Sequence, residues 1–263
     1  MAKKRYLFFD IDGTLVAGGY GAGFIPESTQ LALKKLRDAG HFMCIATGRM
    51  HAMATDYMQQ LDFDNMISDG GYGATIDGEF LGITPLPKED IIELIDECIE
   101  KGYPWGLQVE DSKIRFTPDK SFEEFSDDKY MNTRIVPGLD PRNYDNIYKA
   151  YIACYEPDEQ ALESLKKLPW CRFHKEYIFV EPADKAYGIK RVMQHFNADL
   201  KDAVVFGDAL NDLSMFTDDG WYKVAMGNAV PEVKERADYI TAPVDQDGIY
   251  QACEKLGLFE KIV

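Results

Sequence analysis

Short apolar runs alternate with amphipathic stretches over the first part of this chain. Residues 6–9 and 42–46 are almost wholly apolar, which is typical of strands buried on both faces of a parallel sheet. Between them, residues 27–39 carry apolar positions at helical spacing and end at Gly40. Another helix is expected from His51 to about Leu61. An order of strand, helix and strand predicts a doubly wound parallel sheet.

The same alternation returns near the carboxyl end of the chain. A helix pattern covers residues 186–196, an apolar run covers 203–206, and a further helix is expected from Asn211. Apolar runs near 222–225 and 239–240 complete this part. We therefore expect residues 1–82 and 184–263 to form one α/β domain around a single sheet.

The middle of the chain has a different pattern. Residues 88–101 and 158–168 are each amphipathic at helical spacing. The strand-like pieces of this part are residues 105–109, 114–117, 150–155 and 178–180. The pattern predicts an antiparallel α+β domain over residues 83–183, inserted into the first domain.

Composition and charge limit the classes of function. The 263 residues are 46% hydrophobic and include 29 basic against 45 acidic side chains, a net charge of −16. Such an acidic chain lacks the positive surface of a nucleic-acid binder, and anionic membranes are unsuitable partners for the same reason. No apolar run approaches the roughly 18 residues of a membrane-spanning helix. The 5 cysteines are scattered, which indicates reduced thiols and predicts a cytoplasmic protein.

The strongest chemical signal is Asp10-Ile11-Asp12-Gly13-Thr14, directly after the first apolar run. Side chains two positions apart on a strand share a face, so both carboxylates can point into the crevice beyond the strand. Two such carboxylates repel each other unless a cation or a proton intervenes. An Asp-Gly turn is the simple alternative. A calcium loop is excluded because Leu15 stands where the loop requires glycine.

A second acidic group, Gly207-Asp208-Ala209-Leu210-Asn211-Asp212, follows the apolar run 203–206. For this segment alone, helix capping through Asp208 or Asn211 is an alternative explanation. Together with the first group, it places carboxylates at two strand ends of one sheet and favours a hard divalent cation. Mg²⁺ suits a few carboxylates together with water and a substrate phosphate.

Two weaker signals fit an anionic ligand. Ala46-Thr47-Gly48-Arg49 follows the second strand, and a hydroxyl with backbone N–H groups at a helix start can hold phosphate. Arg49 adds a fork of donors, although an ordinary loop with a surface arginine is the simpler explanation of this motif in isolation. Asp184-Lys185 begins the helix that follows the inserted domain. A lone lysine there is usually a solvated charge.

In their order along the chain, these four motifs resemble those of the haloacid dehalogenase superfamily of phosphotransferases. They are most similar to its Cof-like branch of sugar-phosphate phosphatases. The segments Ala225-Met226-Gly227-Asn228-Ala229 and Asp247-Gly248 match that branch as well. The resemblance covers essentially the whole chain. It implies a Rossmann-like core and an inserted cap domain that closes over the site and contacts the leaving group.

The resemblance also implies a role for each site residue. Asp10 resembles the nucleophile that forms an aspartyl-phosphate, and Asp12 resembles the general acid/base. Thr47, Lys185 and Asn211 resemble phosphate-binding residues. The implied ligands of Mg²⁺ are Asp10, the main-chain carbonyl of Asp12, and Asp208. The implied supporting residues are Gly48, Arg49 and Asp212, and Asn211 and Asp212 match residues that support the metal and orient Lys185.

The implied function is Mg²⁺-dependent hydrolysis of a small phosphorylated metabolite, in particular a sugar phosphate. Two alternatives stay open: a phosphomutase with the same nucleophile, and a non-catalytic sensor of a phosphorylated ligand. One departure from the family pattern concerns Asn-Gly-Ala near position 70. This chain instead has Ser68-Asp69-Gly70-Gly71-Tyr72-Gly73-Ala74. Oligomeric state and specificity residues are not predicted.

Overall fold

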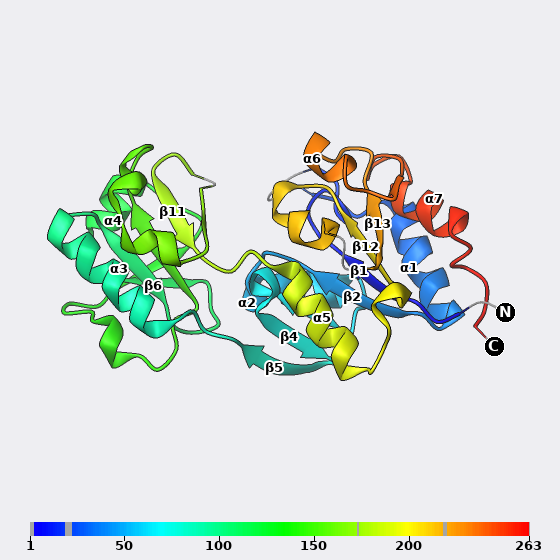
Figure 1. The fold of residues 1–263 in the computed structure, drawn as a ribbon, viewed down its shortest axis with the longest axis horizontal. Helices are drawn as coiled ribbons and strands as arrows, with labels where there is room; N and C mark the ends of the chain where they lie inside the picture. Colours follow the sequence, from blue (N-terminus) through cyan, green and yellow to red (C-terminus); the bar gives the residue numbers. More distant parts are fainter. Residues whose placement is uncertain (1–2, 19–22, 173, 218–219, 263) are drawn as a thin grey trace. The chain divides into compact units, whose positions relative to one another are not determined.

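An eight-stranded sheet runs through the first of two units into which the chain divides (Figure 1). The computed structural model describes residues 3–18, 23–172, 174–217 and 220–262. Unit 1 comprises Met1–Arg49, Ala54–Gly82 and Asp184–Val263, and unit 2 comprises Met50–Met53 and Ile83–Ala183.

The sheet of unit 1 is mainly parallel. Its strand order is β14 (Tyr239–Ile240), β13 (Tyr222–Ala225), β12 (Ala203–Gly207), β1 (Tyr6–Phe9), β2 (Phe42–Ala46), β3 (Met66–Ser68), β4 (Gly73–Ile76) and β5 (Glu79–Ile83). Neighbours from β14 to β3 pair in parallel, and β4 pairs with β3 antiparallel. The predicted α/β fold class is confirmed.

Helices cover both faces of this sheet, which explains why its central strands are apolar at every position. Leu7 and Phe9 of β1 lie in the core shared with α1 (Glu27–Ala39) and α7 (Gly248–Lys255). Phe8 points to the opposite face, where α5 (Lys185–His195) and α6 (Pro231–Lys234) pack. Residues Ala54 to Gln60 of α2 (His51–Gln60) join the first of these faces.

The order of the strands creates a crevice at β1. The chain passes from β1 to β2 on one side, and after unit 2 it returns to β12 on the other side. The strands β1, β2 and β12 are parallel, so their carboxyl ends meet at one edge of the sheet. Open α/β sheets bind ligands at such a reversal of strand order.

Unit 2 contains a six-stranded sheet. Its order is β10 (Trp170–Cys171), β11 (Tyr177–Val180), β9 (Lys149–Ala153), β6 (Trp105–Gln108), β7 (Ile114–Thr117) and β8 (Asn132–Ile135). The pairs are antiparallel except for β7 with β8. The helix α3 (Lys88–Lys101) packs on one face, and Phe122 of α4 (Ser121–Ser126) packs with Tyr151 and Tyr177 on the other. In this unit His51 Nδ1 lies 2.6 Å from Asp111.

The prediction of a helix over residues 158–168 is wrong. The structure has two 3₁₀ turns there, η3 (Asp158–Ala161) and η4 (Ser164–Lys167), separated by an extended Leu162. The carboxylate of Glu97 in α3 accepts the backbone N–H groups of Glu163 and Ser164, at 3.0 and 2.9 Å. A tertiary partner therefore takes donors that a continuous helix would use internally.

The segment expected as a helix from Asn211 is also tighter than an α-helix. It forms the 3₁₀ helix η6 (Leu210–Phe216). The remaining short helices are η1 (Asp69–Gly71), η2 (Pro141–Asn143) and η5 (Leu200–Asp202). In the described part of the chain, no helix combines the length and apolar character that spanning a membrane requires. All 5 cysteines are free, and 4 of them are buried.

Candidate active site

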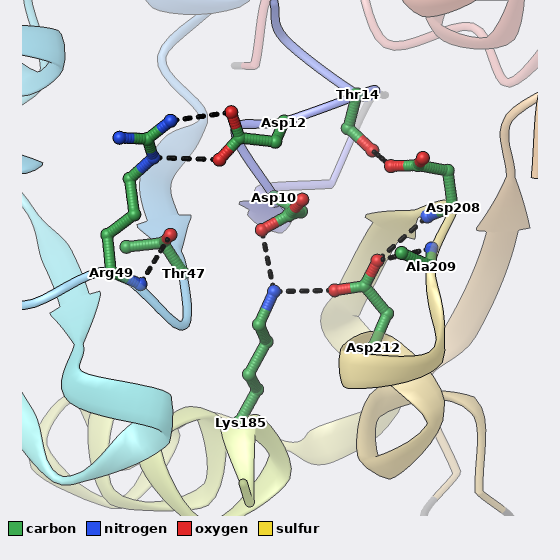
Figure 2. A network of polar contacts seen from close by, with 9 residues as sticks. All are labelled: Asp10, Asp12, Thr14, Thr47, Arg49, Lys185, Asp208, Ala209 and Asp212. Carbon is green, nitrogen blue, oxygen red and sulfur yellow. Dashed lines mark hydrogen bonds and ion pairs between the residues drawn. The ribbon is translucent and has the colours of Figure 1, made fainter. Parts of the chain in front are cut away.

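Lys185 lies between two buried carboxylates at the crevice of unit 1 (Figure 2). Its ammonium donates to Oδ1 of Asp10 at 2.6 Å and to Oδ1 of Asp212 at 2.5 Å. The side chains of the three residues are at most 4% exposed. A lone lysine at such a position is usually a solvated charge, but Lys185, which the resemblance marked as a site residue, is an internal cation of the site.

Local structure fixes both partners of the Lys185–Asp10 pair. Asp10 follows β1 directly, and its N–H donates to the carbonyl of Phe206 in the neighbouring β12. Lys185 is the first residue of α5, and Asp184 caps this helix by accepting the N–H of Tyr187. The side chain thus starts from a capped helix end and extends to the end of the central strand.

Asp212 uses both of its oxygens within the protein. Oδ1 accepts from Lys185, and Oδ2 accepts the backbone N–H groups of Asp208 and Ala209, at 2.8 and 3.0 Å. These contacts shape the turn between β12 and η6. Asp212 is therefore a support that holds Lys185 and the backbone of Asp208 in place.

Asp208 is held by two side chains that the sequence analysis did not name as site residues. Thr14 Oγ1 donates to Asp208 Oδ1 at 2.9 Å. Asn228 Nδ2 lies 3.3 Å from Asp208 Oδ2 and 2.9 Å from the carbonyl of Gly13, and Asn228 Oδ1 accepts the N–H of Val244. Their sequence signal was their position: Thr14 and Asn228 each follow a strand that ends at this edge of the sheet.

Asp12 is bound by Arg49. The guanidinium donates through Nε and Nη2 to the two oxygens of Asp12, both at 2.7 Å. The backbone N–H of Arg49 donates to Thr47 Oγ1 at 3.1 Å. The fork of donors that the sequence suggested for a phosphate is directed at the second carboxylate of the first motif.

Thr47 and Gly48 follow β2, and Gly48 lies beside Asn211 of η6. Thr47 is 1% exposed, and a Cβ at Gly48 would lie 3.5 Å from Asn211 Nδ2. Asn211 Oδ1 is buried and has no hydrogen-bond partner among the described residues. Lys185 donates to Asp212, so Asp212 is the residue that orients the lysine.

The loop that lacks the family's Asn-Gly-Ala packs against the start of α5. The N–H of Asp184 donates to the carbonyl of Gly70 at 2.8 Å. Gly71 has a φ of 109°, and a Cβ there would lie 2.0 Å from the carbonyl oxygen of Asp184. Only glycine fits this close approach. The loop thereby sets the position of the helix end that carries Lys185.

The electrostatics of the carboxylate group favour an additional cation. Burial, and then repulsion from Asp212, raise the pKa of Asp208 to about 7. The same two causes raise the pKa of Asp10, although Lys185 opposes them. The pKa of Lys185 itself is raised because its two carboxylate partners outweigh the effect of burial. Burial and the repulsion among the acids together exceed what one ammonium group compensates.

The donors present fit a hard divalent metal ion. Asp10, Asp208 and Asp212 each offer an oxygen within 4.8 Å of the others. Asp212 accepts from Lys185 and from two backbone N–H groups, whereas each oxygen of Asp208 has one neutral side-chain donor and Asp10 accepts from Lys185 at Oδ1. Asp10 and Asp208 are therefore the side chains best placed to ligate a cation. Carboxylate oxygens are the ligands that Mg²⁺ and similar ions prefer. The side chain of Asp12 faces Arg49 and not this group of acids.

These features define a site for phosphoryl transfer: an acidic nucleophile candidate, a second carboxylate two positions later, a buried lysine and a metal-compatible pair of acids. A family model described as haloacid dehalogenase-like hydrolase matches residues 7–253. The chain belongs to this family. The predicted family and enzyme class, a phosphoric monoester hydrolase of the haloacid dehalogenase type, are confirmed.

Named relatives and solved structures align with nearly the whole chain. The chain is 33% identical to "Putative phosphatase YkrA" of Bacillus subtilis, covering 98% of this chain and 99% of YkrA. It is 28% identical to 5-amino-6-(5-phospho-D-ribitylamino)uracil phosphatase YitU of Bacillus subtilis, covering 95% and 96%. The solved structure of the subclass IIB sugar phosphatase BT4131 is 29% identical, with a TM-score of 0.74 and coverage of 97% of this chain and 100% of that one.

Proposed function

We propose that the protein is a Mg²⁺-dependent phosphatase that hydrolyses a small phosphorylated metabolite, a sugar phosphate, through an aspartyl-phosphate on Asp10. The observation that carries the proposal is the Lys185 ammonium between Asp10 and Asp212. A buried carboxylate held by a lysine at a strand end can attack phosphorus from a fixed position. Thr47, Lys185 and Asn211 are the proposed phosphate-binding residues, and Gly48 is proposed to support them at the start of the loop.

The first step transfers the phosphoryl group to the protein. An oxygen of Asp10 forms a bond to phosphorus while the bond from phosphorus to the leaving oxygen breaks. Asp12 gives its proton to that leaving oxygen, which departs as an alcohol. A general acid is required here because an alkoxide is a poor leaving group.

The second step returns the protein to its starting state. Asp12, now ionised, takes a proton from a water molecule whose oxygen attacks phosphorus. The bond between phosphorus and Asp10 breaks, which releases inorganic phosphate and restores the Asp10 carboxylate. Asp12 is again protonated and ready for the next leaving group. Dividing one displacement into two lets a single pair of carboxylates perform both.

Charge is the main obstacle in both steps because an anionic carboxylate approaches an anionic ester. Lys185 supplies one positive charge directly at Asp10. A Mg²⁺ ion held by Asp10, the main-chain carbonyl of Asp12, and Asp208 would neutralise further charge on the transferring group. Asp212 would hold both Lys185 and the backbone of Asp208 in position.

The substrate class is supported by the relatives. BT4131 is named as a sugar phosphatase, and the YitU substrate carries its phosphate on a ribityl chain. A sugar phosphate and the phosphorylated ribityl compound are both phosphate esters of polyhydroxylated carbon chains. We therefore propose an ester of this kind for the present protein.

The test is phosphate release from a panel of sugar, sugar-alcohol, nucleotide and vitamin-related phosphates. Each compound is assayed with Mg²⁺ and with EDTA, for the native protein and for Asp10→Asn. We expect release from one or a few sugar or sugar-alcohol phosphates that requires Mg²⁺ and is abolished in Asp10→Asn. The matched control is Asp64→Asn, an exposed acid of the same unit, which should release phosphate at the native rate.

Each alternative outcome has a separate meaning. Hydrolysis by a stably folded Asp10→Asn would refute the nucleophile. An isomerised sugar phosphate in place of inorganic phosphate would establish a phosphomutase. Tight Mg²⁺-dependent binding without turnover of any compound would establish a phospho-ligand sensor.

A further inference from the structure

Arg49 and Asp12 form a two-point ion pair that the assigned roles leave unexplained. Nε and Nη2 of Arg49 each lie 2.7 Å from a different oxygen of Asp12 (Figure 2). Charge-assisted pairs of this geometry fix the plane of the carboxylate as well as its position. A lysine in the same place would provide a point charge without this orientation.

The arginine is itself held on several sides. Its side chain is only 8% exposed, and the guanidinium lies 4.9 Å from the ring centre of Tyr57 in α2. Its backbone N–H donates to Thr47 Oγ1, and its carbonyl accepts the N–H of Asp69. Arg49 is therefore a rigid connection between the Thr47 loop and Asp12.

Asp12 keeps an open edge in spite of this pair. Its side chain is 24% exposed, three times the exposed fraction of the Arg49 side chain. Each carboxylate oxygen has two lone-pair positions, and the fork occupies one on each oxygen. The fork thus leaves a second position on each oxygen at which a proton can be held or transferred.

We infer that Arg49 is the positioning residue of the proton-transfer step: it aims the Asp12 carboxyl at the leaving oxygen and sets its distance from the phosphoryl group. The inference rests on the proposed function, in which Asp12 is the general acid/base. In that function Thr47 binds the phosphoryl group, and Asp12 donates a proton to the leaving oxygen on the other side of the breaking bond. Arg49 contacts both, so it can set the separation between them.

This role differs from phosphate binding in a measurable way. A residue that binds phosphate stabilises every phosphate ester to a similar degree. A residue that aims a general acid matters in proportion to the need of the leaving group for a proton. Nitrophenolate leaves without protonation, whereas an alkoxide does not.

The experiment compares Arg49→Lys with the native protein on p-nitrophenyl phosphate, phenyl phosphate and glycerol phosphate. We expect Arg49→Lys to change kcat/KM for p-nitrophenyl phosphate by less than ~3-fold and to reduce kcat/KM for glycerol phosphate by roughly 10- to 100-fold. This ratio reports the transfer to Asp10 alone, in which only glycerol phosphate needs the aimed acid. Arg37→Lys, an exposed arginine on α1, is the matched control and should leave all three rates unchanged.

A double-mutant cycle separates positioning from a general structural effect. If Arg49 acts through Asp12, adding Arg49→Lys to Asp12→Asn should cause no further loss in kcat, because residues that act as a unit are not additive. A merely structural contribution would reduce both backgrounds by the same factor. Urea unfolding of each variant, and Arg49→Gln as a second substitution, identify any loss of the folded state.

Two results would overturn the inference while leaving the proposed function intact. One is an equal loss for all three esters that is expressed in KM, which would make Arg49 a phosphate ligand. The other is full additivity in the cycle with Asp12→Asn. If the native protein hydrolysed none of the three esters and no member of the metabolite panel, the proposed function would fail first, and the inference with it.

Discussion

Lys185 and Asp10 form a buried ion pair of 2.6 Å although 175 positions separate them in the sequence. Asp10 directly follows the first strand of the chain, and Lys185 begins the first helix after unit 2. The pair therefore exists only when both parts of unit 1 have assembled around their common sheet. The integrity of the fold and the presence of the site are linked through this contact.

Replacing Lys185 with methionine should reduce both activity and stability. Asp10 and Asp212 would lose their shared cation, and breaking a buried ion pair typically costs ~3–5 kcal/mol. Removing a charge-stabilising donor should also lower kcat by roughly 10²- to 10³-fold. Urea unfolding and steady-state kinetics measure the two effects. Lys190→Met, at an exposed position of the same helix, should change neither.

A side chain at Gly71 should displace the start of α5. Gly71→Ala must adopt a φ of 109° and places its Cβ 2.0 Å from the carbonyl oxygen of Asp184. We expect a lower urea midpoint together with lost activity, because Lys185 follows Asp184 directly. Gly78→Ala is the matched control: it has a φ of 79°, but a Cβ there meets nothing within 4 Å. Equal effects of the two substitutions would contradict the role assigned to the loop.

Periodicity predicted most of the elements of unit 1 because these strands and helices depend on a simple rule of burial. Tyr6–Phe9 and Phe42–Ala46 are apolar throughout since helices cover both faces of the sheet. The prediction of a helix over residues 158–168 failed because Glu97, which is distant in sequence, accepts backbone N–H groups of this segment. Apolar residues at helical spacing indicate which face of a segment is buried. They do not indicate whether a distant side chain will bind the backbone of that segment.

The buried ion pair of Arg115 and Asp128 should support unit 2. Arg115 Nη1 donates to Asp128 Oδ2 at 2.8 Å, and the two side chains are 0% and 3% exposed. Asp128→Asn leaves a buried guanidinium without its counter-charge, so we expect a loss of ~3–5 kcal/mol in the free energy of unfolding.

The neighbouring Asp127→Asn is a matched control for Asp128→Asn. Asp127 pairs with Lys129 at the surface, with both side chains more than three-quarters exposed. Exposed pairs contribute little, so its effect should stay within ~0.5 kcal/mol. Urea unfolding of the two variants gives the comparison. A similar small loss for both would show that the Arg115 charge is solvated or compensated by its other contacts.

His41 should make stability depend on pH. Burial lowers the pKa of His41 below the ordinary 6.5, and Nδ1 accepts the N–H of Arg5 while Nε2 contacts the carbonyl of Leu258. The unfolded chain therefore binds more protons than the folded one below about pH 6.5, so the free energy of unfolding should fall as the pH falls through that range.

The comparison with His41→Gln isolates this contribution. Unfolding free energies are measured for both proteins at about pH 7.5 and about pH 5.5. The native protein should lose more stability than the variant between these values. Identical losses would assign the pH dependence to other groups.

The sequence located most candidate site residues but not their partners. Strand ends placed Asp10, Asp12, Thr47 and Asp208 at one edge of the sheet, as the topology requires. It did not show that Arg49 would pair with Asp12, because a guanidinium near a strand end suits a carboxylate and a phosphate equally. Asn228 was visible only as part of a motif. Which polar group pairs with which depends on side-chain geometry that spacing does not record.

The most direct test of the account is the chemical identity of the phosphorylated residue. The native protein is mixed rapidly with the substrate found in the panel, quenched in acid and treated with borohydride, which reduces an acyl phosphate to an alcohol. Peptide mass spectrometry should then find homoserine at position 10 and unmodified aspartate at position 12. Reduction at Asp12 instead of Asp10, or no reduced carboxylate under conditions in which phosphate is released, would contradict the account.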